Sequence, residues 1–181
     1  MAAGQTQLPR SLPKVESAKT VGLISDTHIP SRAKSIPADV FKIFENVDYI
    51  IHAGDLVDIS VIDELEQCAP VLAVHGNMDT PQVCRMLPEV NSLKLMNYKI
   101  GVIHDPGGLY GICKLRDVAR QNFFDVLVYG HTHSSSVEWE GKTLFVNPGS
   151  PCCPEPPFLC KPSVGVLKIT KEAVFPEIIH I

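Results

Sequence analysis

Five short apolar runs, each followed at once by polar residues, constrain the fold more than any other feature of the chain. The runs are nearly continuous in apolar residues, which is typical of strands buried on both faces of a sheet. Segments with helical periodicity lie between them, and this alternation predicts an α/β fold. The five predicted strands span 20–26, 49–55, 70–77, 99–105 and 124–133.

Three segments carry the apolar stripe of a helix that packs on a sheet. The segment 37–47 begins with Pro37, which suits a first helical turn. The segment 58–69 begins with Asp58, a common N-cap residue, and the third segment spans 110–123. The stripes consist of Val40, Phe44 and Val47, of Ile62, Leu65 and Ala69, and of Ile112, Leu115 and Ala119.

The last quarter of the chain has no helical pattern. Residues 134–150 indicate a hairpin that turns at Glu140, Gly141 and Lys142, and residues 163–181 indicate two further strands. We expect these late strands to pair antiparallel, with a second sheet packed on the first as one arrangement.

Length and charge limit the classes of function. The chain has 181 residues, enough for one domain with a sizeable core, and we expect this domain to span 19–181. Residues 1–18 lack the apolar centre of a secretory signal and are too polar to pack, so we expect a flexible tail, with a transit peptide as the second interpretation. The net charge of -4 gives no nucleic-acid signature. No apolar run is long enough to cross a bilayer, so the expected location is cytoplasmic.

The six cysteines contain no C-x-x-C pair, which argues against a zinc knuckle. In a cytoplasmic chain we expect most of them to be reduced and buried. Cys152, Cys153 and Cys160 lie in a proline-rich stretch. This cluster is interpreted as a rigid loop that contains thiols, with a redox or soft-metal site as the alternative.

Each predicted strand stops on residues that can bind metal. Ligands of open α/β sheets bind outside the carboxyl ends of the strands, and parallel strands bring these ends to one edge. His131 and His133 are two residues apart, so in an extended segment they share a face. We therefore expect seven donors to meet in one crevice: Asp26, His28, Asp55, Asn77, His104, His131 and His133.

Each donor alone has a structural explanation. Asp26 and Asp55 suit loops after strands, Asn77 suits a turn, and a lone His104 suits a core. Together, two carboxylates and four histidines buried without a cation would carry severe costs of desolvation and repulsion. His52, His75 and His180 are interpreted as structural, the first two because they lie inside predicted strands and the third because it lies at the C-terminal end.

Seven donors are too many for one tetrahedral zinc ion. They suit two ions of intermediate character that share a bridging carboxylate. Two-metal sites with ions about 3.5–4 Å apart serve phosphoryl hydrolysis. A mononuclear zinc hydrolase is the alternative, and counting the metal ions per chain would distinguish it from a two-metal site.

The motifs that contain these donors resemble those of the calcineurin-like metallophosphoesterases: D-x-H, G-D-x-x-D, G-N-H-[D/E], a lone His, and G-H-x-H. They occur here in the same order, from residue 20 to about residue 150, and the NPGS at 147–150 resembles the small microbial phosphodiesterase branch. The matching segments are Asp26-Thr27-His28, Gly54-Asp55-Leu56-Val57-Asp58, Gly76-Asn77-Met78-Asp79, His104 and Gly130-His131-Thr132-His133.

The resemblance implies a single-domain α/β fold, a two-sheet β-sandwich flanked by helices. It implies a phosphodiesterase whose nucleophile is a hydroxide that bridges two divalent ions, with Mn²⁺ the expected metal and Ni²⁺, Fe²⁺ or Zn²⁺ the alternatives. The first ion is held by Asp26, His28, Asp55 and His133; Asp55 bridges to the second, which Asn77, His104 and His131 complete. Asp55, Asn77 and His104 are the expected catalytic residues.

Two departures from the family pattern bear on the chemistry. Met78 stands where many relatives have a histidine that protonates the leaving group or binds phosphate. The fourth motif reads HDPGG instead of HGH, so a second histidine is missing. Asp58 would ordinarily orient the missing histidine, so its role shrinks to helix capping. We expect diesters with acidic leaving groups to be better substrates than alkyl monoesters.

The expected partner is a small phosphodiester substrate. Arg32 and Lys34 follow the first motif, where they either attract phosphate or, as the favoured interpretation, are solvated surface charges. Residues 27–37 also resemble the start of the retromer scaffold subunit, so a non-catalytic docking scaffold on the same fold is the alternative function. Self-association into homo-oligomers is left open.

Overall fold

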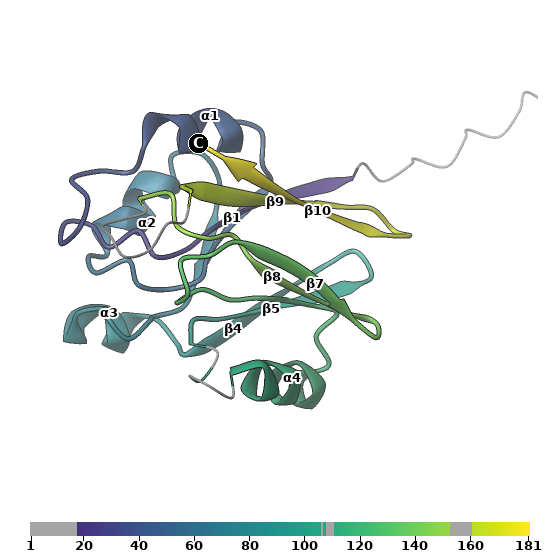
Figure 1. Ribbon diagram of the computed structural model, residues 1–181. Helices are drawn as coiled ribbons and strands as arrows, with labels where there is room; N and C mark the ends of the chain where they lie inside the picture. Colours follow the sequence, from purple (N-terminus) through teal and green to yellow (C-terminus); the bar gives the residue numbers. More distant parts are fainter. Residues whose placement is uncertain (1–17, 106, 108–110, 153–160) are drawn as a thin grey trace, which may run out of the picture.

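The computed structural model describes residues 18–105, 107, 111–152 and 161–181 (Figure 1). Ten strands form two five-stranded sheets. The first sheet contains β10 (Val174–His180), β9 (Ser163–Ile169), β1 (Lys19–Ile24), β2 (Tyr49–His52) and β3 (Val71–Ala73), in this order. The second contains β4 (Val90–Leu95), β5 (Tyr98–Ile103), β6 (Val126–Val128), β8 (Thr143–Asn147) and β7 (Ser136–Glu140). The helices are α1 (Ala38–Phe44), α2 (Ser60–Leu65), α3 (Pro81–Met86) and α4 (Gly111–Asn122).

The sheets pack face to face and form a sandwich with helices outside. One core cluster lies between the sheets and includes Val21, Ile51, Val102 and Val146. A second includes Ile50 of the first sheet and Phe44 of α1, and a third joins Leu127 of the second sheet to Leu115 of α4. Figure 1 shows α1 above the first sheet and α4 below the second. This four-layer arrangement confirms the predicted fold class.

The five early apolar runs form strands, but the sheet that they build is divided. Strands β1, β2 and β3 pair in parallel in the first sheet, whereas β5 and β6 pair in parallel in the second. The late strands form the predicted antiparallel hairpins β7–β8 and β9–β10. The expectation that they form a sheet of their own is wrong, because β8 pairs with β6 and β9 pairs with β1.

The helices differ from the sequence prediction in two ways. Helix α1 is shorter than 37–47, with Pro37 at the N-cap, and α2 is shorter than 58–69, with Ile59 at the N-cap. Asp58 lies one residue earlier, although its carboxylate accepts a hydrogen bond from the Ser60 backbone N–H at 2.9 Å. Helix α3 was not predicted; its N-cap, Thr80, accepts from the Val83 N–H at 3.4 Å and Pro81 occupies the first turn.

The predicted burial of the cysteines is wrong for the four that the structure describes. Cys84 and Cys113 are exposed, and Cys68 and Cys152 are half-buried. Burial raises the pKa of the Cys152 thiol to about 11, so the thiol is protonated at neutral pH and is a weak nucleophile. Cys153 and Cys160 lie outside the described residues, as do residues 1–17 of the predicted tail.

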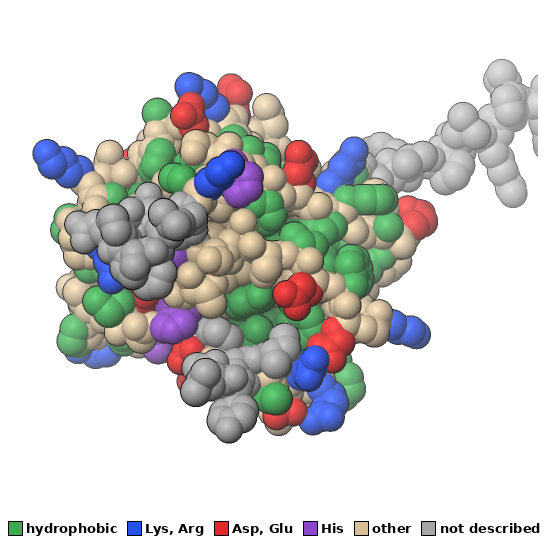
Figure 2. All heavy atoms as spheres, viewed as in Figure 1, with side chains coloured by type: hydrophobic (Ala, Val, Ile, Leu, Met, Phe, Trp, Pro, Cys, Tyr) green, Lys and Arg blue, Asp and Glu red, His purple; other side chains and the backbone are tan. Residues whose placement is uncertain are grey.

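Within the described residues, no helix combines the length and the apolar character needed to cross a membrane. On the face drawn in Figure 2, the lysine and arginine side chains of the described residues are interspersed with acidic ones.

Candidate metal centre

Five loops bring the seven predicted donors to one end of the sandwich. The loops follow β1, β2, β3, β5 and β6, each at the carboxyl end of its strand. The carboxylates and histidines there form two clusters, both of which include Asp26. The predicted convergence of the strand ends is therefore present, with strands of both sheets contributing to it.

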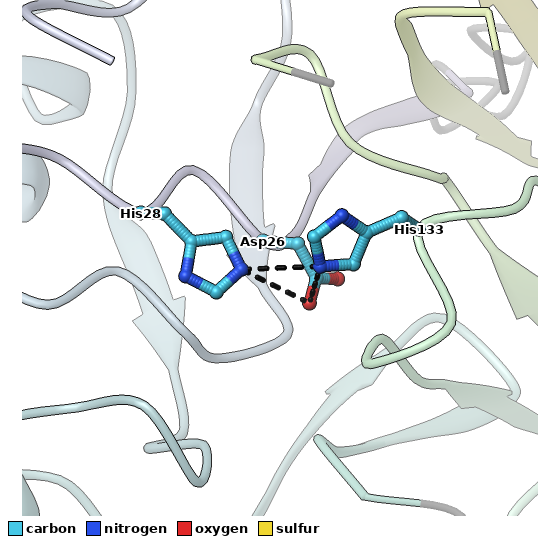
Figure 3. A group of neighbouring side chains, drawn as sticks. All are labelled: Asp26, His28 and His133. Carbon is cyan, nitrogen blue, oxygen red and sulfur yellow. Dashed lines mark hydrogen bonds and ion pairs between the residues drawn. The ribbon is translucent and has the colours of Figure 1, made fainter. Parts of the chain in front are cut away.

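The first cluster consists of Asp26, His28 and His133, whose donor atoms lie within 4.8 Å of one another. The two Nε2 atoms are 3.1 Å apart. Asp26 Oδ1 lies 3.3 Å from His133 Nε2 and 3.9 Å from His28 Nε2. Figure 3 shows the two imidazoles and the carboxylate pointing at one small volume. All three residues are buried.

The second cluster contains Asp26, Asp55 and His104, again within 4.8 Å. His104 Nε2 lies 3.3 Å from Asp55 Oδ2 and 3.1 Å from Asn77 Oδ1. The same oxygen of Asn77 is 2.9 Å from His131 Nδ1. Asn77 and His131 are both exposed, so this side of the centre is open to solvent.

Asp55 connects the two clusters through a single atom. Its Oδ2 lies 3.7 Å from His28 Nε2 and 3.3 Å from His104 Nε2. Its other oxygen, Oδ1, accepts a hydrogen bond from the Met78 backbone N–H at 2.7 Å. One carboxylate oxygen is thus held between donors of both groups.

The pKa shifts of His28 and Asp55 suit cation binding, whereas that of His104 does not. Burial would lower the pKa of His104, but the hydrogen bond with Asp55 and the charges of Asp26 and Asp55 outweigh burial and raise it. Burial lowers the pKa of His28, in spite of the nearby charges of Asp55 and Asp26, so the neutral imidazole has a lone pair to offer. Burial alone would raise the pKa of Asp55, but the hydrogen bond to His104 and the His104 charge outweigh it, and the pKa is lowered. Imidazole, carboxylate and amide oxygen form the mixed donor set of intermediate divalent ions.

Hydrogen bonds outside the donor set orient two of the donors. The Nδ1 of His104 lies 2.7 Å from the Ala53 carbonyl oxygen, which can only accept, so Nδ1 carries the proton and Nε2 faces the centre. Asp26 Oδ2 accepts from Ser25 Oγ at 2.5 Å and from the His131 N–H at 3.0 Å. The main chain of His131 therefore fixes a carboxylate of the first cluster.

The backbone is left-handed at most of the donor positions. Asp26, His28, Asp55, His131 and His133 have φ angles between 48° and 73°. This conformation is unfavourable for residues with a Cβ and costs on the order of 1–2 kcal/mol each. The premise that His131 and His133 share one face of an extended segment is therefore wrong. Both follow the end of β6, and the first turns to Asn77 while the second turns to Asp26.

Two motif glycines are required by close packing. A Cβ on Gly130 would collide with Ser25 Oγ, and it would lie 2.8 Å from the Ala53 carbonyl oxygen. A Cβ on Gly76 would collide with Asp55 Oδ1. Any side chain at these positions would displace a candidate ligand or the atom that orients it.

Asp79 is a supporting residue to which the sequence analysis gave no role. Its carboxylate accepts from the backbone N–H groups of Gly76 at 2.6 Å, Asp55 at 3.1 Å and Val57. Burial is the main cause of its raised pKa. The carboxylate ties the loop after β2 to the loop after β3. Its place as the last residue of the third motif was the signal that could have identified it.

The segment 147–150 has a similar supporting role. Asn147 Nδ2 donates to the Gly130 carbonyl at 2.9 Å and to Thr132 Oγ1 at 3.1 Å. Ser150 Oγ donates to the Asp26 carbonyl at 2.7 Å. These bonds join the loop after β8 to the two loops that carry the first cluster.

The remaining histidines lie outside both clusters. His52 is fully buried in β2; its Nδ1 accepts from the Gly54 N–H and its Nε2 lies 3.2 Å from Thr27 Oγ1. Burial lowers the pKa of His52 to about 4, so it is neutral. His75 is not inside a strand, because β3 ends at Ala73. It lines a cavity of about 170 Å³ next to Asn77 and His104.

A cavity of about 470 Å³ opens over the centre. Its wall consists of His28, Arg32, Asp55, Asn77, Met78, His131, Thr132 and His133. Arg32 therefore lies at the mouth of the cavity, as the interpretation that it attracts phosphate required. Lys34 is not part of the cavity wall. Met78, which replaces the family histidine, is 48% exposed.

Comparisons with known proteins agree with this geometry. Residues 20–172 match the model of the calcineurin-like phosphoesterase superfamily domain. A probable metallophosphoesterase of Methanothermobacter thermautotrophicus is 40% identical over 163 residues, which cover 88% of this chain and 91% of the relative. A phosphodiesterase of Methanocaldococcus jannaschii is 30% identical over 84% of this chain and 94% of its own.

Solved structures also match the fold. Vps29 of Entamoeba histolytica, crystallised in complex with Zn²⁺, aligns with a TM-score of 0.72 at 27% identity. The alignment covers 89% of this chain and 98% of that protein.

Proposed function

Because the chain belongs to the calcineurin-like phosphoesterase superfamily, we propose that it is a phosphodiesterase that works with two divalent metal ions. The proposed ligands of the first ion are Asp26, His28, Asp55 and His133, and those of the second are Asp55, Asn77, His104 and His131. The side chains form two clusters that have only Asp26 in common, and this supports the binding of two ions.

The position of Asp55 is the observation that carries this proposal. Its Oδ2 lies between His28 Nε2 and His104 Nε2, at 3.7 and 3.3 Å. A site for a single ion needs no carboxylate that faces two separate groups of nitrogen donors. A bridging carboxylate is what a pair of ions a few ångströms apart requires.

The bound ions would supply an activated water and offset the charge that develops on the phosphate. The chain itself contributes the orientation of the ligands. His104 is fixed by the Ala53 carbonyl, and Asp26 is fixed by Ser25 and the His131 main chain. Manganese is the proposed metal because the donor set combines imidazoles with carboxylate and amide oxygens, which suit it, and elemental analysis would identify zinc, nickel or iron in its place.

The cavity wall supports a preference for good leaving groups. The Met78 thioether has no proton to donate, and its backbone N–H is already bonded to Asp55. Without a general acid, alkoxide leaving groups should depart about 10²–10⁴-fold more slowly than in an enzyme that has one. We expect turnover of bis(p-nitrophenyl) phosphate to exceed that of a sugar phosphate; rapid hydrolysis of sugar phosphates would contradict this preference.

The direct test combines elemental analysis with hydrolysis of bis(p-nitrophenyl) phosphate. We expect two metal ions per wild-type chain. The Asp55→Ala variant should contain at most one ion and lose far more activity than the roughly 10–100-fold that changes around a metal site cost. Asp58→Ala is the matched control, since Asp58 belongs to the same motif but its carboxylate accepts from the Ser60 N–H, outside both clusters. A wild type that is fully active with one ion would overturn the dinuclear mechanism.

A docking scaffold is the second candidate function. The similarity to Vps29 supports it, and Vps29 of Chaetomium thermophilum has been crystallised with a cyclic peptide. Trp139 of β7 and Phe175 of β10 are exposed, and Figure 2 shows apolar side chains on the face that these strands share. The complete set of seven donors favours the enzyme, because a scaffold does not need strained, buried metal ligands.

A further inference from the structure

The cavity over the candidate metal centre has one cationic side chain in its wall. Five of its eight wall residues are candidate metal ligands, and Met78, Thr132 and Arg32 are the others. Met78 and Thr132 carry no charge. An anion in this cavity therefore meets Arg32 as the positively charged side chain of the wall.

The main chain around Arg32 is attached to the centre. The Arg32 N–H donates to the His28 carbonyl at 2.8 Å, and Ser31 Oγ donates to the same oxygen at 3.0 Å. The Ile29 N–H donates to the Leu56 carbonyl at 3.1 Å, which links this loop to the loop of Asp55. The main chain of Arg32 is thus held in a fixed position relative to a ligand of each proposed ion.

The guanidinium of Arg32 has no carboxylate partner among the described residues. Two other surface arginines are paired: Arg116 with Glu140 at 2.6 Å, and Arg120 with Asp117 at 2.6 Å. An unpaired guanidinium beside an anion-binding cavity is available to a phosphate, and its planar fork suits two phosphate oxygens at once.

We propose that Arg32 binds the non-bridging oxygens of the substrate phosphate and replaces the charge, but not the proton, of the histidine that Met78 has displaced. This inference rests on the proposed function and extends it to a residue outside the family motifs. Arginine is protonated throughout the working pH range, so it cannot give a proton to the leaving group. As the water oxygen forms its bond to phosphorus, the bond to the leaving oxygen breaks. That oxygen departs with the electron pair and takes its proton from solvent.

Two measurements on the manganese-loaded protein test this role. The first is calorimetric titration with inorganic phosphate, and the second is kcat/KM for aryl methyl phosphates whose leaving groups span a range of acidity. Arg32→Ala should weaken phosphate binding and lower kcat/KM by about 10–100-fold, as expected when a hydrogen bond to a charged group is lost. The loss should be the same for good and poor leaving groups, and Arg32→Lys should lose less.

Lys34→Ala is the control, because Lys34 is an exposed cation two residues away that is not part of the cavity wall. It should stay within about twofold of wild type, and metal content should be unchanged in all variants. The inference is overturned if Arg32→Ala binds phosphate within twofold of wild type, or if its loss grows as the leaving group becomes poorer. If wild type binds phosphate through Arg32 but hydrolyses no diester, the proposed function fails and the inference stands.

Discussion

The two clusters of candidate ligands differ in their access to water. In the first, His28 and His133 are 2% and 8% exposed, whereas the second relies on Asn77 and His131, both exposed. Charges interact more strongly where solvent does not screen them. The comparison teaches that the proposed sites are unequal. The enclosed site should retain its ion, and the open site should exchange it.

The distinction between an enclosed and an open site is wrong if substitutions of His131 and His133 have the same effect on metal binding. His133→Ala removes a donor from the enclosed site, and we expect activity to fall by more than about 100-fold with loss of the tightly held ion. His131→Ala should leave the first ion in place and weaken the second. Elemental analysis after extensive dialysis measures both outcomes. Equal losses of metal in the two variants would contradict the assignment of an enclosed and an open site.

Asp79 sharpens the comparison, because it supports the loops of Asp55 and Asn77. Asp55 is shared by the two proposed ions, whereas Asn77 belongs to the second alone. Asp79→Ala leaves three buried or half-buried backbone N–H groups without their acceptor. We expect affinity for the second ion to fall by about 10–100-fold, with the first ion less affected. Titration of the metal-free protein with Mn²⁺ separates the two affinities, and Asp63→Ala, an acidic change elsewhere on the chain, is the control. A uniform loss at both sites would argue for general destabilisation.

The last prediction concerns the pH dependence of stability and depends on His52, which lies outside both clusters and is neutral in the folded protein. The pKa of His52 is about 4 in the folded protein, against 6.5 for an unperturbed histidine. The unfolded chain therefore binds the extra proton between these pH values, so stability is fully present above pH 6.5 and declines toward pH 4. The shift corresponds to about 3 kcal/mol.

His52→Gln keeps a donor for Thr27 and an acceptor for Gly54 but does not titrate. With EDTA present, so that metal release does not contribute, urea unfolding of the variant should lose less stability than wild type between pH 7 and pH 4. Parallel pH profiles for the two proteins would exclude His52 as a source of the pH dependence. His180→Gln, at an exposed position of β10, is the control.

The sequence predicted the strand cores well, because they are local patterns, whereas the role of the following residues as metal donors stays a prediction. Buried strands read as apolar runs, and the donors follow them directly. The division into two sheets was not predictable from those runs, since it depends on pairings such as β1 with β9 between residues that are more than 100 positions apart. Helix α3 was missed because six residues carry little periodicity, although Thr80-Pro81 signalled its start.

The supporting contacts were harder to predict than the donors. Asp79 serves the site by accepting from three backbone N–H groups in two loops, and a sequence pattern does not show where main-chain groups meet. The conformation of His131 and His133 was misread for a related reason. Spacing by two implies one shared face only in extended backbone, and both residues have positive φ.

The left-handed donor positions have a consequence for how this chain can change. Each would be relieved by glycine, which accepts positive φ without a steric penalty. In a descendant no longer selected for its chemistry, glycine in place of His28, His131 or His133 would remove this backbone cost and a candidate metal ligand at once. At Asp26 and Asp55 the same change would also remove the carboxylates that accept from Ser25 and Met78, so drift toward glycine should begin at the histidines.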